Sequence, residues 1–316
     1  MSRKKVAISV GDLNGIGIQL AIENHEIISQ EIEAVYCIDR NMLEQAAQKL
    51  NLRIPDDFQT MEGIAKHFEI EAGTVSKESG AYAYASFAKA VELARYKEVD
   101  AITTLPIHKK AWELAGVAYK GHTDALRDLF DADAIMMLGS PKMYVALFTE
   151  HIPLKEVAGS INEKALTRFL LDFYRTAKPN TQVAVLGLNP HAGDDGVLGT
   201  EERIIQKAID NAHREIGTKI FSAPLVPDVA FTPRVRANYT HYIAMYHDQG
   251  LAPLKALYFD EGINVSLNLP ILRTSVDHGT AFDIAYKGLR LNALSYINAI
   301  KYIKGRDEKS AYHNDQ

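Results

Sequence analysis

The sequence at residues 183–194 is VAVLGLNPHAGD, an apolar run that stops at an Asn-Pro pair and leads into a polar turn. Aliphatic and β-branched residues bounded by glycine and proline predict a strand that is buried on both faces. The turn after such a strand is where an open α/β sheet carries its functional groups. His191 is therefore expected at the carboxyl end of a buried strand.

The same arrangement occurs at two other places in the chain. YVALF at residues 144–148 precedes His151, and YIAMY at 242–246 precedes His247. Three imidazoles at strand ends would suit a divalent metal with one position open for a substrate. The spacing also fits histidines that only form hydrogen bonds within their own turns, so both interpretations remain at this point.

Length and charge limit the class of protein. A chain of 316 residues has room for about two domains. Its 35 basic and 40 acidic residues give a net charge of −5, with both signs interspersed. This balance predicts no broad basic surface for nucleic acid or for an anionic membrane, but it allows a small anionic substrate.

Cysteine usage and hydropathy indicate the compartment. The chain has one cysteine, Cys37, inside the apolar run AVYCI, where a small buried hydrophobic residue is the expected role. The amino-terminal apolar run is too short for a signal peptide, and no eighteen apolar residues occur together. We expect a soluble, cytoplasmic protein.

A glycine-rich turn follows the first predicted strand. Residues 6–10 are VAISV, and residues 11–17 are GDLNGIG, directly before a predicted helix. Such a turn can bring backbone N–H groups close to a phosphate, or it can be only a tight connection from strand to helix. The spacing is not that of the G-x-G-x-x-G fingerprint, so both interpretations stay open.

Several polar residues suit a small anion. Lys255, Asn264 and Arg273 lie on consecutive predicted elements and offer two cations and an amide to a carboxylate or phosphate. His122 and Thr123 precede a helix whose free N–H groups also suit an anion, although His122 fits an ordinary turn residue equally well. The signatures of P-loop ATPases, G-x-S-x-G hydrolases and H-E-x-x-H proteases do not occur.

Two adjacent acids, Glu201 and Glu202, follow Gly199 and Thr200 at the start of a predicted helix. Acids in a first helical turn interact favourably with the helix dipole. We expect this pair to stabilise the helix rather than to take part in chemistry.

Taken together, these motifs resemble the 4-hydroxythreonine-4-phosphate dehydrogenase (PdxA) family nearly from end to end. The resemblance rests on GDLNGIG at 11–17, Pro106 with Lys109, GHT at 121–123, NPHAG at 189–193, GTEE at 199–202, YHDQGL at 246–251 and RTSVDHGTA at 273–281. NPHAG, YHDQG and TSVDHGTA in this order are the specific motifs. Two departures, the residues after Gly11 and Asp124 in place of a glutamate, bear on substrate or cofactor affinity.

The resemblance implies a fold and its domains. We expect an α/β protein of two α/β/α domains with a cleft between them, similar to isocitrate and isopropylmalate dehydrogenases. Residues 1–125 and 262–316 would form the first domain, with the cofactor loop. Residues 126–261 would form the second, with the metal-ligand histidines and the dimer contacts.

The resemblance also implies roles for individual residues. His151, His191 and His247 match the metal ligands, and His122, Thr123, Lys255, Asn264 and Arg273 match the substrate-binding positions. HGTAFDIA at 278–285 is similar to the loop that holds the adenosine of a nicotinamide cofactor in isocitrate and isopropylmalate dehydrogenases, so cofactor contacts are expected at Asp277, His278, Gly279, Thr280 and Ala281. The general base stays open among Asp248, Asp228 and Lys109.

The implied reaction is a metal-dependent oxidation. The family uses NAD or NADP and a divalent metal (zinc, magnesium or cobalt) to oxidise 4-phosphohydroxy-L-threonine to 2-amino-3-oxo-4-(phosphooxy)butanoate. This product decarboxylates to 3-amino-2-oxopropyl phosphate, in pyridoxal 5'-phosphate (vitamin B6) biosynthesis. A related dehydrogenase of phosphothreonate or phosphoerythronate is the alternative within this class. A non-catalytic metal-binding module and a metallohydrolase are alternatives of other classes.

The family's habit implies a homodimer in which both chains supply metal ligands to each site. We expect His151 and His247 to reach one metal from different subunits if the site is shared in this way. Neither nucleic acid nor a membrane is expected as a partner.

Overall fold

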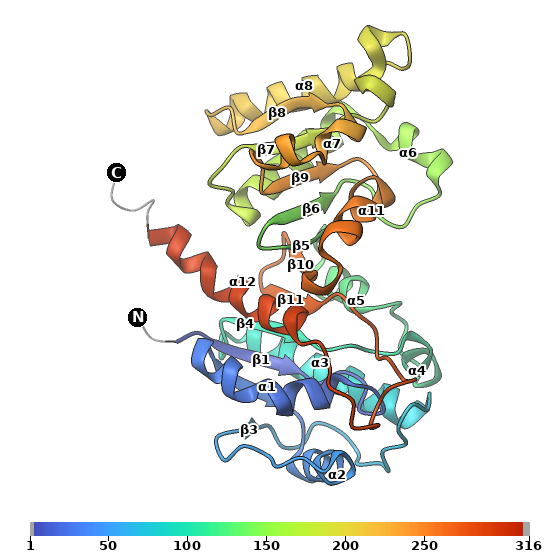
Figure 1. The fold of residues 1–316 in the computed structure, drawn as a ribbon, viewed down its shortest axis with the longest axis vertical. Helices are drawn as coiled ribbons and strands as arrows, with labels where there is room; N and C mark the ends of the chain where they lie inside the picture. Colours follow the sequence, from blue (N-terminus) through green and yellow to red (C-terminus); the bar gives the residue numbers. More distant parts are fainter. Residues whose placement is uncertain (1–2, 312–316) are drawn as a thin grey trace. The chain divides into compact units, whose positions relative to one another are not determined.

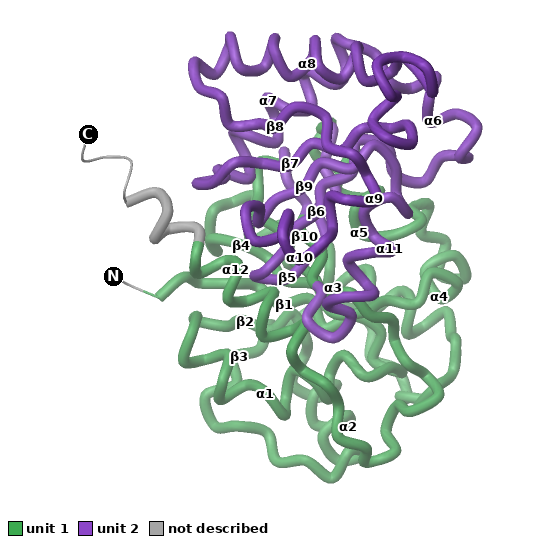
Figure 2. Tube along the Cα trace, turned by 45° about the horizontal axis from the view of Figure 1, so that its top comes forward, with its two compact units in different colours: residues 1–132, 263–265, 269–316 green, residues 133–262, 266–268 purple. Residues whose placement is uncertain are grey.

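The computed structural model describes residues 3–311, and its contacts divide the chain into two compact units (Figure 2). Unit 1 comprises Met1–Ala132, Ile263–Val265 and Leu269–Gln316, and unit 2 comprises Asp133–Gly262 and Ser266–Asn268. The limits expected from the sequence, 125/126 and 261/262, lie close to these divisions. Strand β10 (Ile263–Leu267) has residues in both units.

The sheet of unit 1 has parallel strands in the order β3-β2-β1-β4-β11 (Figure 1). Its strands are β1 (Lys5–Ser9), β2 (Glu33–Cys37), β3 (Gln59–Thr60), β4 (Ala101–Thr104) and β11 (Leu272–Val276). Its helices are α1 (Gly17–Glu31), α2 (Arg40–Leu50), α3 (Lys77–Arg95), α4 (Lys109–Leu114), α5 (His122–Phe130) and α12 (Leu294–Ala311). This alternation of strand and helix is typical of a parallel sheet covered by helices.

Each face of this sheet has its own apolar core, because successive side chains of a strand point to opposite faces. Val6 and Ile8 of β1 belong to one core, and Ala7 between them belongs to the other. Cys37 lies in the same core as Ala7, and burial raises the pKa of its thiol to about 12. The cysteine is therefore a buried apolar residue, as expected.

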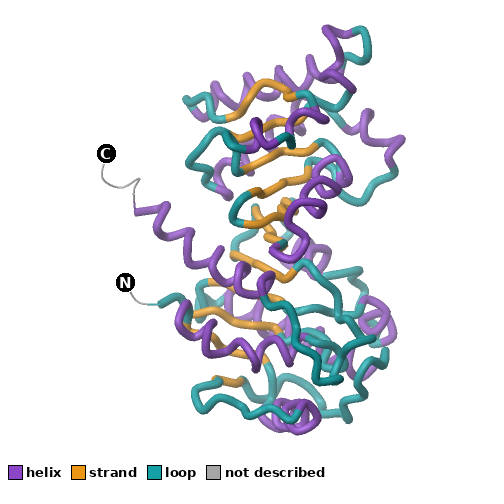
Figure 3. Tube along the Cα trace, viewed as in Figure 1, coloured by secondary structure: helices purple, strands orange, loops and turns teal. Residues whose placement is uncertain are grey.

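The sheet of unit 2 has the order β5-β6-β9-β7-β8 (labelled in Figure 1), and Figure 3 draws its strands in orange. β5 and β6 are antiparallel, whereas the β6–β9, β9–β7 and β7–β8 pairs are parallel. The strands are β5 (Ile135–Ser140), β6 (Met143–Leu147), β7 (Val183–Leu186), β8 (Phe221–Leu225) and β9 (His241–Ala244). The predicted strand at the start of 183–194 is thus confirmed as β7, and all four of its residues are buried.

The helices of unit 2 include two long amphipathic ones that pack against each other, α7 and α8. Residues at helical spacing on α8, Ile205, Ile209 and Ala212, are buried. The helical elements are α6 (Leu154–Ser160), α7 (Glu163–Ala177), η1 (Pro190–Gly196), α8 (Glu201–Ile216), α9 (Pro227–Ala230), α10 (Pro233–Arg236), α11 (His247–Tyr258) and η2 (Phe259–Glu261). Across the described part of both units, every helix is too short or too polar to cross a bilayer.

The glycine-rich turn at residues 11–17 is entirely buried in unit 1. Gly11 has a φ of +70°, and a Cβ built on it would lie 2.2 Å from the carbonyl oxygen of Pro106. A Cβ on Gly15 would lie 2.8 Å from the carbonyl oxygen of Thr280. These glycines allow close approach to other backbone segments, so the turn is a tight packing connection in this structure rather than an open phosphate cradle.

We predict that Gly11→Ala destabilises the protein while Gly159→Ala does not. Alanine at position 11 combines an unfavourable φ with overpacking and should cost roughly 1–3 kcal/mol or more. Gly159 lies in α6 with open space around it, so alanine there should be neutral or stabilising by up to about 1 kcal/mol. Urea unfolding of both variants measures the difference. Equal midpoints would contradict the packing role of Gly11.

Candidate metal and anion sites

The three histidines follow strands that are neighbours in the sheet of unit 2. His151 follows β6, His247 is the first residue of α11 after β9, and His191 lies in η1 after β7. Because β9 lies between β6 and β7 and is parallel to both, the carboxyl ends of the three strands share one edge. The prediction that three strands each lead to a histidine is confirmed.

His151 and His247 are the two histidines that the chain brings together. Their ring centroids lie 5.5 Å apart, with an angle of 43° between the ring planes. Two imidazole nitrogens about 2.0–2.1 Å from a tetrahedral zinc ion place their ring centroids about 5 Å apart. The pair therefore has the separation that two ligands of one ion require.

Asp248 fixes the orientation of His247. The Nδ1 atom of His247 lies 2.8 Å from Oδ1 of Asp248. A carboxylate on one ring nitrogen orients a ligand histidine and leaves the other nitrogen for a metal. The interaction gives Asp248, whose side chain is 83% exposed, a role in holding the imidazole.

His191 lies apart from this pair in the single chain. Among the described residues, no three histidine, cysteine, aspartate or glutamate side chains come close enough to hold one ion. His191 is exposed and sits in a turn with left-handed backbone, at φ 53° and ψ 26°. One chain thus supplies two of the three predicted ligands to one place, and the third projects elsewhere.

The acids at the start of α8 do more than stabilise the helix. Oε2 of Glu201 accepts hydrogen bonds from Nδ2 of Asn189 at 2.7 Å and from the N–H of Thr200 at 3.0 Å. The Asn189 amide holds the pKa of Glu201 below its usual range. The pair therefore also contacts the turn that carries His191, which the sequence analysis did not anticipate.

Gln249 ties together the strand ends behind His191 and His247. Its Oε1 accepts from the N–H of Met245 at 2.7 Å, and its Nε2 donates to the carbonyl of Gly187 at 2.6 Å. Met245 follows β9 and Gly187 follows β7. This buried amide therefore links the two segments that lead to the histidines. In the sequence, only the position of Gln249 within the YHDQG motif pointed to such a role.

In unit 1, Arg273 of β11 is a buried cation that is 3% exposed. Its Nε and a terminal nitrogen donate to Oγ1 of Thr104 on β4, at 3.2 and 2.7 Å. Burial lowers the pKa of Arg273 to about 9, so the guanidinium stays charged at neutral pH. The predicted anion-binding cation is thus held between two parallel strands.

His122, the first residue of α5, is buried beside aromatic rings. Its ring centroid lies 4.8 Å from that of Phe87 and 5.3 Å from that of Trp112. Burial first, and then the charge of Arg273, holds the pKa of His122 well below its usual range, so the imidazole is neutral. Its Nε2 atom is buried and has no hydrogen-bond partner in the described part of the chain.

The remaining predicted substrate residues lie on separate elements. The Oδ1 atom of Asn264 on β10 is likewise buried without a hydrogen-bond partner among the residues described. Thr123 is half-buried and follows His122 in α5. Lys255 lies on α11 of unit 2, where its Nζ is 5.9 Å from the ring centroid of Phe259.

The three candidates for a general base differ in their surroundings. Asp248 is hydrogen-bonded to His247, and Asp228 lies exposed in the short helix α9. Lys109 is exposed at the start of α4, with its Cε 4.0 Å from the position of a Cβ on Gly121. Lys109 therefore lies next to the amino terminus of α5, where His122 and Thr123 are.

The predicted cofactor loop packs on the glycine-rich turn of unit 1. The carbonyl of Thr280 accepts from the N–H of Ile16 at 3.0 Å, and Ala281 has a left-handed φ of 45°. His278 is largely buried with no hydrogen-bond partner for its Nε2 in the described region, and burial lowers its pKa. A Cβ on Gly279 would meet nothing within 4 Å, so protein packing does not require glycine there.

Asp12 and Asn14 hold the glycine-rich turn in place. The carboxylate of Asp12 accepts from the N–H of Asn14 at 3.0 Å and from the hydroxyl of Ser79 at 3.2 Å. The side chain of Asn14 accepts from the N–H of Glu71 at 2.9 Å and donates to the carbonyl of Thr74 at 2.8 Å. Both side chains are thus engaged in hydrogen bonds within unit 1.

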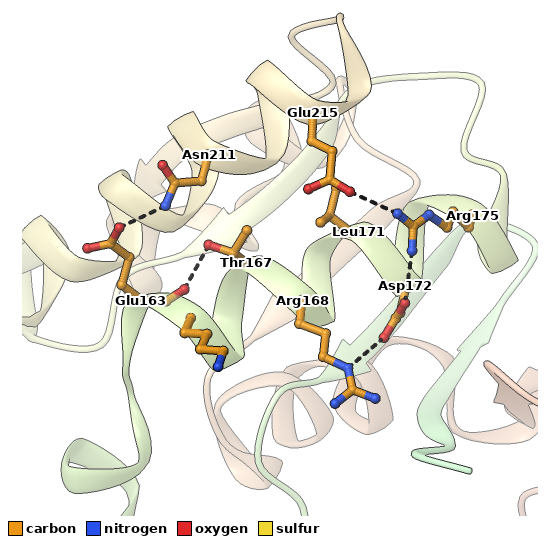
Figure 4. A pocket seen from close by; sticks show the side chains of 9 residues that line it. Glu163, Thr167, Arg168, Leu171, Asp172, Arg175, Asn211 and Glu215 are labelled. Atoms are coloured by element: carbon orange, nitrogen blue, oxygen red, sulfur yellow. Dashed lines mark hydrogen bonds and ion pairs between the residues drawn. The ribbon is translucent and has the colours of Figure 1, made fainter.

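A groove of about 700 Å³ lies on α7 and α8 of unit 2 (Figure 4). Among its lining residues, Arg175 lies 3.0 Å from Glu215, and Asn211 donates to Glu163 at 2.8 Å. The groove is lined by none of the residues that the sequence assigned to a site.

The fold and these side chains define an α/β protein with a buried cation in one unit and paired imidazoles in the other. Residues 30–303 match the family described as "Pyridoxal phosphate biosynthetic protein PdxA". The chain belongs to the PdxA family.

Relatives and solved structures agree with this family. The 4-hydroxythreonine-4-phosphate dehydrogenase of Sulfurimonas denitrificans is 60% identical over 95% of this chain and 97% of its own length. The 4-hydroxythreonine-4-phosphate dehydrogenase of Campylobacter fetus is 49% identical over 96% of this chain and 98% of its own length. The structure of the Klebsiella pneumoniae enzyme has a TM-score of 0.80 at 31% identity, covering 96% of this chain and 98% of that one.

We predict that Asp12→Asn changes how stability depends on pH. Burial raises the pKa of Asp12 from 3.8 to about 6. The folded state therefore keeps this proton to higher pH than the unfolded state, so wild-type stability should fall as pH rises from about 4 to 6. The asparagine variant lacks this slope. Its free energy of unfolding relative to that of the wild type should therefore rise by up to about 3 kcal/mol between pH 4 and pH values above 6.

Urea unfolding of both proteins between pH 4 and 8 measures the effect. Curves that stay parallel over this range would show that the Asp12 carboxyl does not carry the slope.

Proposed function

We propose that this chain oxidises 4-phosphohydroxy-L-threonine to 2-amino-3-oxo-4-(phosphooxy)butanoate, which decarboxylates to 3-amino-2-oxopropyl phosphate, in pyridoxal 5'-phosphate biosynthesis. NAD or NADP would accept the hydride, and a divalent cation (zinc, magnesium or cobalt) would be required. Family membership and relatives at 49% and 60% identity support this activity.

One observation in unit 1 carries the proposal. Nε2 of His122 and Oδ1 of Asn264 are buried without hydrogen-bond partners in the described chain. A buried polar atom without a partner costs about 1–3 kcal/mol, so a ligand that pairs with it would recover this free energy on binding. A phosphorylated hydroxy amino acid offers both the acceptors and the donors that these two atoms and the Arg273 cation need.

The residues of unit 1 would bind and orient the substrate. The guanidinium of Arg273, already aligned by Thr104, suits two oxygens of a carboxylate or phosphate. Thr123, beside the amino terminus of α5, would add a hydroxyl. Lys255, which belongs to unit 2, is proposed as a second cation for the substrate on the basis of the family resemblance.

The residues of unit 2 fit a metal. The separation of the His151 and His247 rings suits two ligands of one ion, and Asp248 orients His247. A divalent cation held there supplies Lewis-acid polarisation of the substrate for both oxidation and decarboxylation. With Asp248 engaged by His247, Lys109 is the candidate we favour for accepting the hydroxyl proton.

The loop from Asp277 to Ala281 would hold the nicotinamide cofactor. Gly279 is exposed and open on the side where a Cβ would lie, which allows backbone to approach a ligand closely. The unpartnered Nε2 of His278 offers a hydrogen bond. Such a loop replaces the Rossmann fingerprint that the sequence lacks.

The experiment that tests this function is reduction of NAD or NADP, followed by absorbance, with 4-phosphohydroxy-L-threonine as substrate. We expect turnover that chelation abolishes and a divalent cation restores. Phosphothreonate and phosphoerythronate in the same assay test the alternative within the class. Turnover with those sugar acids alone would reassign the substrate, and absence of any NAD or NADP reduction would reject the activity.

We predict that Arg273→Ala and Lys255→Ala weaken substrate binding without weakening cofactor binding. Each removes a charge-assisted contact worth roughly 1.5–3 kcal/mol, or about ten- to a hundredfold in substrate KM. The KM for NAD should stay near the wild-type value. If the cofactor KM rose instead while the substrate KM held, these cations would belong to the cofactor site.

We propose that the two chains of a homodimer share each metal site. The family resemblance implied that His151 and His247 come from different subunits. Their 5.5 Å separation within one chain favours the two as a pair, with His191 supplied by the partner chain. In a symmetric dimer, His191 of each chain would then bind the metal together with His151 and His247 of the other chain.

We predict that inactive His191→Ala and inactive His247→Ala restore activity when their subunits are mixed. One site of the mixed dimer collects both substitutions, and the other keeps three native histidines, so activity should reach about half that of a native dimer. The control is His151→Ala mixed with His247→Ala, which should stay inactive because both sites keep a broken pair. If activity were restored only in the control mixture, His151 and His247 would have to come from different subunits, as the sequence resemblance implied.

A further inference from the structure

The turn that carries His191 has an unusual backbone. Six consecutive residues have positive φ: His191 (53°), Ala192 (51°), Gly193 (82°), Asp194 (44°), Asp195 (55°) and Gly196 (100°). Residues other than glycine seldom adopt this region, and a run of them persists only when neighbouring groups hold it. Some part of unit 2 must therefore fix this turn.

Glu202 contacts the turn at its start. Oε1 of Glu202 accepts from the N–H of Leu188 at 2.9 Å and from the N–H of Asn189 at 2.7 Å. Its Oε2 accepts from the side-chain Nδ2 of Asn189 at 2.9 Å. One half-buried carboxylate thus binds three N–H donors in the two residues that precede Pro190 and His191.

Two glycines let the backbone close around this carboxylate. A Cβ on Gly193 would lie 2.6 Å from Oε2 of Glu202, and one on Gly187 would lie 3.2 Å from Oε1. The chain therefore passes against the same carboxylate before His191 and after it. The Glu202 side chain fills the inside of the turn, and the His191 side chain is exposed on it.

We propose that Glu202 is a positioning residue for His191, holding the left-handed turn so that the imidazole is presented to the metal. Without the carboxylate, three N–H groups lose their acceptor and the strained turn is free to relax. The inference rests on the proposed function, in which His191 is a metal ligand. Glu202 acts through His191 and touches neither metal nor substrate.

Glu163 provides a matched control. It lies in the first turn of the neighbouring helix α7 and accepts one asparagine amide, from Asn211 at 2.8 Å. It shares helix-dipole interactions with Glu202 but has no contact with a turn that carries a histidine. A purely helical role for Glu202 would make the two positions equivalent.

The experiment is calorimetric titration of Co²⁺ into the metal-free full-length protein, for wild type, His191→Ala, Glu202→Ala, Glu202→Gln and Glu163→Ala, with melting temperatures measured in parallel. We expect Glu202→Ala to bind Co²⁺ about 10- to 100-fold more weakly, as orienting partners of metal ligands typically do when removed. Glu202→Gln keeps an oxygen for the two backbone N–H groups and should lose less. Glu163→Ala should bind as wild type does.

The outcomes separate this inference from the proposed function. If His191→Ala binds Co²⁺ as wild type does, the metal site itself is wrong. If His191→Ala binds weakly but Glu202→Ala matches Glu163→Ala, only the positioning role fails. If Glu202→Ala does not fold, the Glu202→Gln variant decides the question. A Glu202→Gln variant with the Co²⁺ affinity and the KM values of the wild type would then overturn the inference.

Discussion

The parallel hydrogen-bond ladders that join β9 to β6 and to β7 are the constraint on which the site in unit 2 depends. They align Tyr144 with His241, and Val183 with the same residue, so that all three strands end at one edge. His151 and His247 come together because β6 and β9 are direct neighbours. Local sequence around either histidine contains no information on this adjacency.

Buried polar groups in unit 1 set a second constraint. Nε2 of His122 and Oδ1 of Asn264 are buried without hydrogen-bond partners among the described residues, and Arg273 is a buried cation held by Thr104. An unsatisfied buried polar group costs free energy, and a local exception of this kind is typical of positions that serve binding rather than folding.

Side chains, rather than regular structure, hold the functional turns. Asn14 anchors the glycine-rich turn, Gln249 links the ends of β7 and β9, and Glu202 binds the backbone before His191. Backbone groups outside helices and strands still need partners, and polar side chains supply them here. These residues belong to the motifs at 11–17, 199–202 and 246–251, so the motifs contain residues that stabilise the turns.

The sequence by itself predicted the strands that precede the three histidines, the buried cysteine and the family, because apolar periodicity and motif order are local properties of the chain. It also predicted which residues are chemically suited to a metal and to an anion. Only the tertiary structure decided that His151 pairs with His247 while His191 stands apart, that residues 11–17 form a packed connection, and that Glu202 supports a left-handed turn. Those outcomes depend on strand order, on close backbone approach and on φ angles, which arise from contacts between residues distant in sequence.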